Sequence, residues 1–136
     1  RNGSFMAKKD IFLKKGFVPV DEAEPDFELL VLKFNPGADD PKFKNISLDT
    51  EKYGEGLTVI RSAQCPYSVK NVDAILKTAR DKLKIKANLI DLESSDEAQH
   101  VPCAFGTFCI IYNGKVISHH PISNTRFENI MRKIIQ

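Results

Sequence analysis

The sequence predicts an α/β protein, and two patterns carry this prediction. Short apolar runs rich in β-branched residues, typical of buried strands, alternate with segments whose apolar residues recur every three or four positions, as in amphipathic helices. With 136 residues, 42% apolar and 28% charged, the chain has the composition of an ordinary globular protein. From residue 57 onward the predicted order is strand, helix, strand, short helix or turn, strand, strand and helix. A shorter helix and two strands precede it.

Residues 1–35 are predicted to hold that first helix and the two strands. The helix covers residues 7–15 and ends at Gly16, because glycine tolerates the left-handed conformation found at helix ends. The first strand covers residues 17–20. The second begins at Phe27 and ends at Phe34, and the acidic residues 21–26 connect the two. Because this part is too short to build its own core, we expect it to pack against something else.

Residues 36–56 are predicted to be a linker. Their first part combines prolines, a glycine and acidic residues within a few positions, which indicates a loop, and their last part contains Gly54 and Gly56 among polar residues. The chain therefore divides into residues 1–35, a linker at 36–56, and a second domain at 57–136.

The second domain begins with a β-branched strand at residues 57–60, followed by an amphipathic helix. Pro66 suits the first turn of this helix, where a missing amide donor costs nothing. Its apolar stripe consists of Val69, Val72, Ile75, Leu76, Ala79 and Leu83. A strand at residues 87–92 and a short polar helix or turn at residues 94–100 come next.

Asn113-Gly114 is a strong hairpin signal between strands at residues 108–112 and 115–118. Ser123 or Asn124 is predicted to cap a last helix. Its buried side would consist of Phe127, Ile130, Met131 and Ile134.

Composition excludes several classes of protein. No apolar run approaches the roughly 20 residues of a membrane-spanning helix, and the first ten residues hold no secretory signal. The net charge of +2, the pI of about 8.4 and the absence of Trp argue against nucleic-acid binding. Three cysteines without a signal peptide indicate a reducing compartment, so we expect a cytoplasmic protein.

Cys65 stands at the predicted junction of the first strand and the first helix of the second domain, in the sequence Cys-Pro-Tyr-Ser. A thiol at a helix N-terminus faces unpaired amide donors and the positive end of the helix dipole, and both favour the thiolate, which is the nucleophilic form. With the β-α-β start and the later hairpin and helix, residues 57–136 resemble the thioredoxin-like fold, glutaredoxins in particular. The resemblance implies that Cys65 and Ser68 are catalytic. It also implies substrate or partner contacts by Pro66, Tyr67, Phe105, Gly106 and Thr107.

Two positions depart from that family. Ser68 replaces the second cysteine of the usual Cys-x-x-Cys pair, so any redox chemistry would use one thiol. Gly106 stands where the family has a cis-proline. Cys103 is a candidate second thiol for Cys65, and the alternative is that Cys103 is a small loop residue while Cys109 belongs to the core. A further alternative is that the fold is kept and the activity lost.

Residues 12–17, 20–23 and 27–34 resemble the C-terminal end of a GNAT-family N-acetyltransferase: last helix, Gly-Phe turn and closing strand pair. The position of that family's general-acid tyrosine is Phe12 here, which has no proton to donate. The family's glycine-rich pyrophosphate loop is absent from these residues. We therefore expect this chain to bind no cofactor, whereas acetyl-CoA would serve the full-length parent.

The two resemblances in this order, together with residues 41–44 and 105–115, resemble YoaP-type proteins, in which a GNAT domain is followed by a thioredoxin-like YoaP domain. On this resemblance the chain is a truncated form of such a protein. Three hypotheses follow: an accessory domain of an acetyltransferase, a single-thiol enzyme using Cys65, or a non-catalytic interaction module. The expected partner is the GNAT domain of the parent chain, or a second copy that pairs along the strand from Phe27 to Phe34.

Two further groups of residues give weaker signals. His100, His119, His120 and Cys103 do not show the spacing of a zinc site, so no metal is expected. Arg61, at the end of the first strand of the second domain, is interpreted as an ordinary surface arginine. The alternative is that it lowers the pKa of Cys65.

Overall fold

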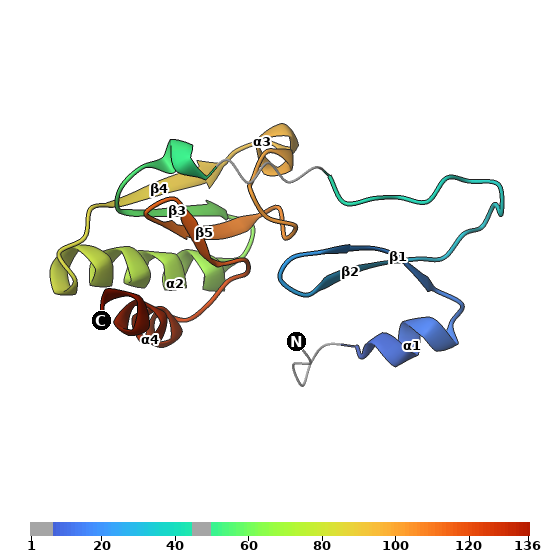
Figure 1. The fold of residues 1–136 in the computed structure, drawn as a ribbon, viewed down its shortest axis with the longest axis horizontal. Helices are drawn as coiled ribbons and strands as arrows, with labels where there is room; N and C mark the ends of the chain where they lie inside the picture. The colour runs from blue at the N-terminus through green and yellow to red at the C-terminus, as the bar shows by residue number, and fades with distance from the viewer. Residues whose placement is uncertain (1–6, 45–49) are drawn as a thin grey trace. The chain divides into compact units, whose positions relative to one another are not determined.

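The structure, a computed structural model, describes residues 7–44 and 50–136. The chain divides into two compact units, Arg1–Lys44 and Asn45–Gln136, called here the N-terminal unit and the C-terminal unit. The division lies within residues 36–56, where the sequence predicts a linker. The protein is mixed α/β with two separate sheets (Figure 1), and no helix among the described residues is long and apolar enough to cross a bilayer.

The first described element of the N-terminal unit is α1 (Lys9–Lys14), which is shorter than the predicted helix at 7–15 and is followed by the predicted turn at Gly16. Gly16 has a φ of 89°. Its amide donates to the Leu13 carbonyl at 3.0 Å, and the Phe17 amide donates to the Phe12 carbonyl at 3.1 Å. This pair of bonds satisfies carbonyls that the helix end would otherwise leave open.

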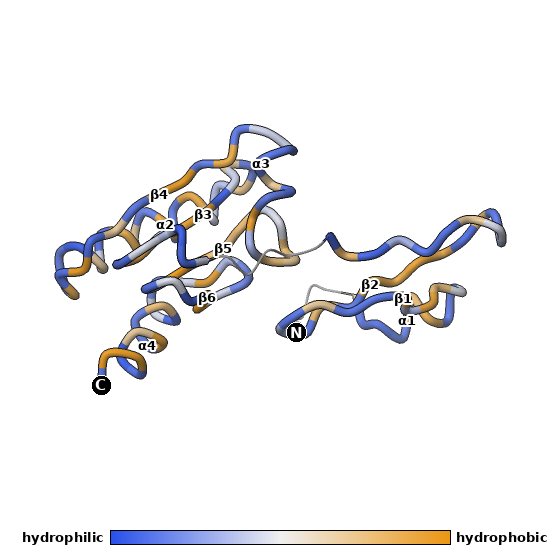
Figure 2. Tube along the Cα trace, turned by 45° about the horizontal axis from the view of Figure 1, so that its top comes forward, coloured by the Kyte–Doolittle hydropathy of each residue, from blue (hydrophilic) through white to orange (hydrophobic). Residues whose placement is uncertain are grey.

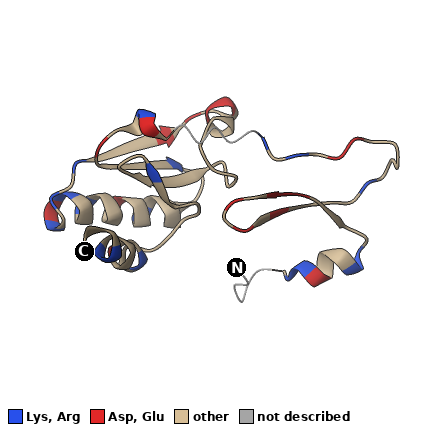
Figure 3. Ribbon diagram, viewed as in Figure 1, with Lys and Arg blue, Asp and Glu red and all other residues tan. Residues whose placement is uncertain are grey.

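The two strands of the N-terminal unit, β1 (Val18–Ala23) and β2 (Phe27–Val31), form an antiparallel hairpin. The predicted boundaries need two corrections. β1 continues through half of the acidic segment, because backbone pairing with β2 extends to Ala23 whatever the side chains are. β2 ends at Val31 rather than Phe34, because its partner begins at Val18, opposite Val31. Acidic residues consequently gather on this hairpin (Figure 3).

None of the residues described between 7 and 44 is buried. Phe34 is 95% exposed, and Ile11 and Val18 are about half exposed. A two-stranded hairpin is at best marginally stable alone in water. The N-terminal unit therefore carries apolar surface without a core of its own.

The C-terminal unit is built on a four-stranded sheet of order β4-β3-β5-β6. β3 runs parallel to β4, and the β3–β5 and β5–β6 pairs are antiparallel. The predicted boundaries of the last three strands are confirmed, while β3 runs two residues further than predicted. The strands are β3 (Leu57–Ser62), β4 (Ala87–Leu92), β5 (Phe108–Tyr112) and β6 (Lys115–Ser118).

Helices α2 (Pro66–Lys77) and α4 (Asn124–Ile135) cover one face of this sheet (Figure 1). α2 continues into a π-helical turn, η2 (Thr78–Lys82). The core on this face joins most of the predicted stripe of α2 to strand residues and to Phe127 and Met131 of α4. Ile134, predicted to be buried, is 45% exposed near the end of α4 and lies outside this cluster. In Figure 2, stretches of β4 and β5 have the colour of apolar residues, as expected for strands that contribute to this core.

A second, smaller core occupies the other face of the sheet. It consists of Ile60, Val101, Cys103, Cys109 and Ile111, with Tyr53, Leu92 and Val116 packed against it. The short helix α3 (Ser95–Gln99) comes just before Val101 and Cys103 of this core in the chain. Ser94 caps α3, since its hydroxyl accepts the Glu97 amide at 3.2 Å.

Residues 50–56, the last part of the predicted linker, belong to the C-terminal unit. Thr50 is buried, and its hydroxyl donates to the Gly114 carbonyl. The short helix η1 (Glu51–Tyr53) follows. The Gly56 amide donates to Oδ1 of Asn113 at 2.8 Å. These contacts connect residues 50–56 to the hairpin turn at Asn113-Gly114. The turn is far away in the sequence, so the composition of residues 50–56 does not predict the contact.

Candidate functional site

Cys65 lies where β3 passes into α2. Its backbone is extended, with φ −117° and ψ 116°, and Pro66 occupies the first position of the helix. The Cys65 carbonyl accepts the Val69 amide at 3.1 Å, which closes the first helical turn. The predicted junction of strand and helix is thus confirmed, and the side chain of Cys65 is exposed to solvent.

The first turn of α2 lowers the pKa of the Cys65 thiol below its ordinary value. The main cause is hydrogen bonding from the Ser68 amide, followed by the Ser68 hydroxyl and the Tyr67 amide, while partial desolvation opposes the shift. These donors stabilise the thiolate more than the thiol. Ser68 is buried, so its hydroxyl is held in place. The arrangement can present a nucleophilic sulfur to solvent.

The segment containing Phe105, Gly106 and Thr107 lies at the same end of the sheet. The amide of Ser62, the last residue of β3, donates to the Thr107 carbonyl at 2.9 Å. Gly106 has a φ of 77°, a conformation that side chains rarely adopt. Phe105 is 40% exposed and Tyr67 is 79% exposed. The predicted contact residues therefore lie on two segments at the same end of the sheet.

Cys103 belongs to the second core, with Cys109 as its neighbour. Cys103 is 1% exposed, and its thiol donates to the Phe108 carbonyl at a sulfur–oxygen distance of 3.0 Å. Its interaction with Cys109, together with burial, raises the pKa of the Cys109 thiol far above its ordinary value. The observed partners of Cys103 favour the packing interpretation over a role as second thiol for Cys65.

Arg61 is not a surface arginine, which corrects the sequence interpretation. Its side chain is only 10% exposed. Nε donates to Oδ1 of Asp91 at 2.6 Å, and Nη1 lies 3.1 Å from Oδ1 of Asp73 and from the Val69 carbonyl. Neither aspartate was predicted to be a site residue from the sequence. The signal for Asp91 was its place in a parallel strand, since it stands directly opposite Arg61.

Histidines do not combine with other side chains into a metal centre in the part of the chain that the structure describes, where no group of three or more candidate ligands is found. Nδ1 of His100 lies 2.7 Å from the Asp96 carbonyl oxygen. His119 and His120 follow the end of β6 rather than alternating within a strand.

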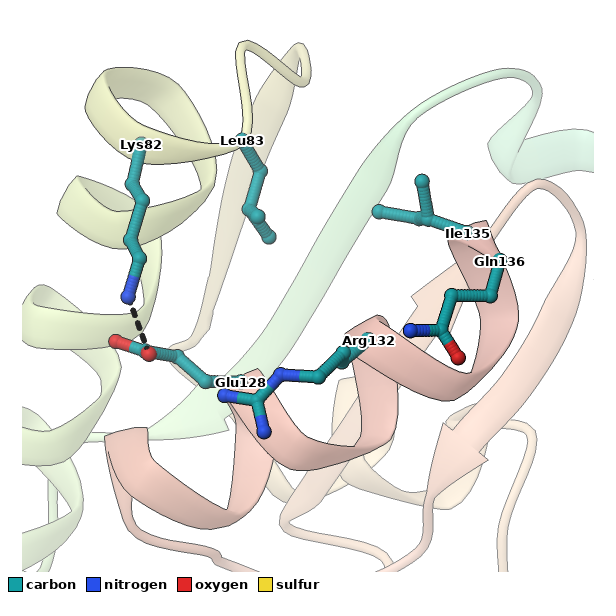
Figure 4. A pocket seen from close by; sticks show the side chains of 6 residues that line it. All are labelled: Lys82, Leu83, Glu128, Arg132, Ile135 and Gln136. Atoms are coloured by element: carbon teal, nitrogen blue, oxygen red, sulfur yellow. Dashed lines mark hydrogen bonds and ion pairs between the residues drawn. The ribbon is translucent and has the colours of Figure 1, made fainter.

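Two cavities in the C-terminal unit lie away from Cys65. One, of about 240 Å³, lies between the end of η2 and α4 (Figure 4), where Lys82 and Glu128 form an ion pair of 2.5 Å. This hydrogen bond from Lys82 is the main reason that the pKa of Glu128 is lowered. The other, of about 500 Å³, has Gly56 and Asn113 among the residues that line it. Neither is lined by a residue that the sequence singled out for chemistry.

Comparison with known proteins points to one family. A family model described as YoaP-like matches residues 87–129. The chain is 31% identical over 130 residues, 96% of its length, to a Bacillus subtilis (strain 168) protein named "Uncharacterized N-acetyltransferase YoaP". It spans about half, 51%, of that protein's length. No solved structure matches the chain. The two matches show that residues 87–129 are similar to a YoaP-like family and that the chain is similar to about half of one YoaP protein.

Proposed function

We propose that this chain is the C-terminal part of a YoaP-type N-acetyltransferase and serves there as an accessory to acetyl transfer. The observation that carries the proposal is the match over 96% of the chain to a protein named as an N-acetyltransferase, of which the chain spans half. In this proposal the longer protein transfers an acetyl group from acetyl-CoA to an amine. The present chain recognises the substrate or covers the active site.

The order of elements in each unit supports the proposal that the chain joins the end of an acetyltransferase domain to an accessory domain. The C-terminal unit has a parallel strand pair joined through α2, followed by a hairpin and a helix, which is the order expected for a thioredoxin-like domain. The N-terminal unit has a helix, a Gly-Phe turn and a strand pair, the order expected for the end of a GNAT domain. That none of its described residues, 7–44, is buried fits a segment that completes a larger sheet.

Acetyl-CoA binding tests the proposal. Isothermal titration with acetyl-CoA is expected to show binding to full-length YoaP and none to the 136-residue chain, because no residue of this chain forms a glycine-rich pyrophosphate loop. Deleting the matching half from full-length YoaP should change its acetyl transfer while leaving acetyl-CoA binding intact. Binding of acetyl-CoA by the 136-residue chain alone would refute the accessory role.

The β1–β2 hairpin is expected to be covered in solution, by packing or by pairing with a second copy along residues 27–34. Exposed strand edges and apolar side chains such as Phe34 favour such contacts. Light scattering should show a mass that rises with concentration above the 15.3 kDa of one chain, or hydrogen exchange should show protected β2 amides. A strictly monomeric chain whose β2 amides exchange freely would contradict this expectation.

A second candidate function is single-thiol, glutaredoxin-like chemistry at Cys65. The favouring observation is an exposed cysteine at the start of α2, where the Ser68 amide, the Ser68 hydroxyl and the Tyr67 amide lower the pKa of the Cys65 thiol. Three free cysteines are compatible with a reducing compartment such as the cytoplasm. If neither acetyl-transfer support nor thiol chemistry is found, a non-catalytic interaction module remains.

A further inference from the structure

Arg61 is the only charged residue that is buried in the part of the chain that the structure describes. It lies on β3, four positions before Cys65. Burying a guanidinium is costly unless its hydrogen-bonding groups find partners. Here the partners come from two other elements, β4 and α2.

The three contacts differ in what they join. The bond from Nε to Asp91 holds β3 to β4, which already pair through their backbones over their full length. The contacts from Nη1 reach α2, at the Asp73 carboxylate and the Val69 carbonyl. Only the second set connects the sheet to the start of the helix. The guanidinium makes both sets because its N–H groups form a rigid fork.

Val69 connects this contact to Cys65. Its amide donates to the Cys65 carbonyl, while its carbonyl accepts from Arg61. The first turn of α2 is thus held at one end by Cys65 and at the other by Arg61. The amides of Tyr67 and Ser68, which lower the pKa of the Cys65 thiol, lie between these two points along the chain.

Charge balance excludes a simple electrostatic explanation. Asp73 and Asp91 together compensate the guanidinium, so little positive field is left for the thiol. Every group that lowers the pKa of Cys65 belongs to the first turn of α2. Arg61 can therefore act on Cys65 only through the geometry of that turn.

We propose that Arg61 is a positioning residue that holds the first turn of α2 against the end of β3 and so keeps the amides of Tyr67 and Ser68 directed at Cys65. The proposal rests on the second proposed function, single-thiol chemistry at Cys65. It differs from a purely structural role, in which Arg61 would stabilise the whole C-terminal unit without a specific effect on the first turn.

Two variants of the full chain separate these roles. Arg61→Lys keeps the positive charge but lacks the fork needed to reach β4 and α2 together. Asp91→Asn, the matched control, weakens the contact to β4 and leaves the contacts to α2 in place. Urea unfolding reports the global stability of each variant, and amide hydrogen exchange at residues 67–69 reports the order of the first turn. The pH dependence of Cys65 alkylation by iodoacetamide, followed by peptide mass spectrometry, reports the thiol.

We expect Arg61→Lys to speed exchange at residues 67–69 by at least about tenfold beyond what its global stability explains, and to raise the pH midpoint of Cys65 alkylation. Asp91→Asn should change stability and leave both local readouts at their wild-type values. The proposal is overturned if folded Arg61→Lys keeps wild-type exchange at residues 67–69, or if Asp91→Asn matches it in both readouts. An ordinary alkylation midpoint in the wild type would instead reject single-thiol chemistry, while faster exchange in Arg61→Lys would still support the positioning role.

Discussion

Replacing Gly56 by alanine is expected to destabilise the C-terminal unit by about 4 kcal/mol, roughly 1–3 for the backbone conformation and roughly 1–3 for the steric clash. Gly56 has a φ of 97°, and a Cβ there would lie 2.6 Å from the Lys86 carbonyl oxygen. That carbonyl also accepts the Leu57 amide at 2.8 Å, so it cannot move without loosening the start of β3. Urea unfolding followed by circular dichroism measures the loss.

Gly54→Ala is the matched control. Gly54 also has a positive φ, 64°, but a Cβ there would meet nothing within 4 Å. Gly54 has ψ −153°, a backbone conformation that is essentially restricted to glycine, so alanine there should cost roughly 1–3 kcal/mol from the backbone alone, without the added clash. If the two alanine variants lose equal stability, the close approach between Gly56 and Lys86 does not contribute.

Cys65→Ser is expected to reduce thiol chemistry to background. In the expected reaction the Cys65 thiolate attacks the glutathionyl sulfur of a glutathione–peptide mixed disulfide and releases the peptide thiol. Glutathione, the reductant, then attacks the Cys65–glutathione disulfide and leaves as oxidised glutathione, which restores the Cys65 thiolate. Release of peptide thiol in the presence of glutathione measures the activity. Activity retained in Cys65→Ser would rule out the single-thiol function.

Ser68→Ala tests whether the Ser68 hydroxyl helps to keep Cys65 in its thiolate form. The amide and the hydroxyl of Ser68 both lower the pKa of the Cys65 thiol, and alanine removes only the hydroxyl. Loss of a donor to the thiolate raises the thiol pKa, so less thiolate exists at pH 7 and alkylation slows. In the wild type the midpoint should lie below the ordinary thiol value of about 8.5. Ser94→Ala, which removes the cap of α3, should leave the midpoint unchanged.

The fold of residues 57–136 could be predicted well because its signals are local. Strands β4, β5 and β6 have the predicted boundaries, and Asn113-Gly114 forms the turn between the last two. Both turn residues have positive φ values, 47° and 73°, as a two-residue hairpin loop requires. The ends of β1 and β2 were predicted less well, because strand length depends on where the partner strand begins and ends.

Only part of the candidate site could be predicted from the sequence. Cys65, Pro66 and Ser68 adjoin one another in the chain, so their arrangement at a helix start follows from local rules. The partners of Arg61 lie 12 and 30 positions away, and nothing local selects them. The same holds for Cys103, whose neighbour is Cys109 in the second core.

The sequence by itself determined the α/β order, the helix that begins after Cys65 and the hairpin at Asn113-Gly114, because side-chain periodicity and turn residues act over a few positions. The tertiary structure decided which residues meet across that framework. The order β4-β3-β5-β6 places Asp91 opposite Arg61, and the packing of α2 brings the Val69 carbonyl within its reach. These contacts depend on strand order and helix packing. Both are set by interactions between residues far apart in the chain, which local sequence patterns do not specify.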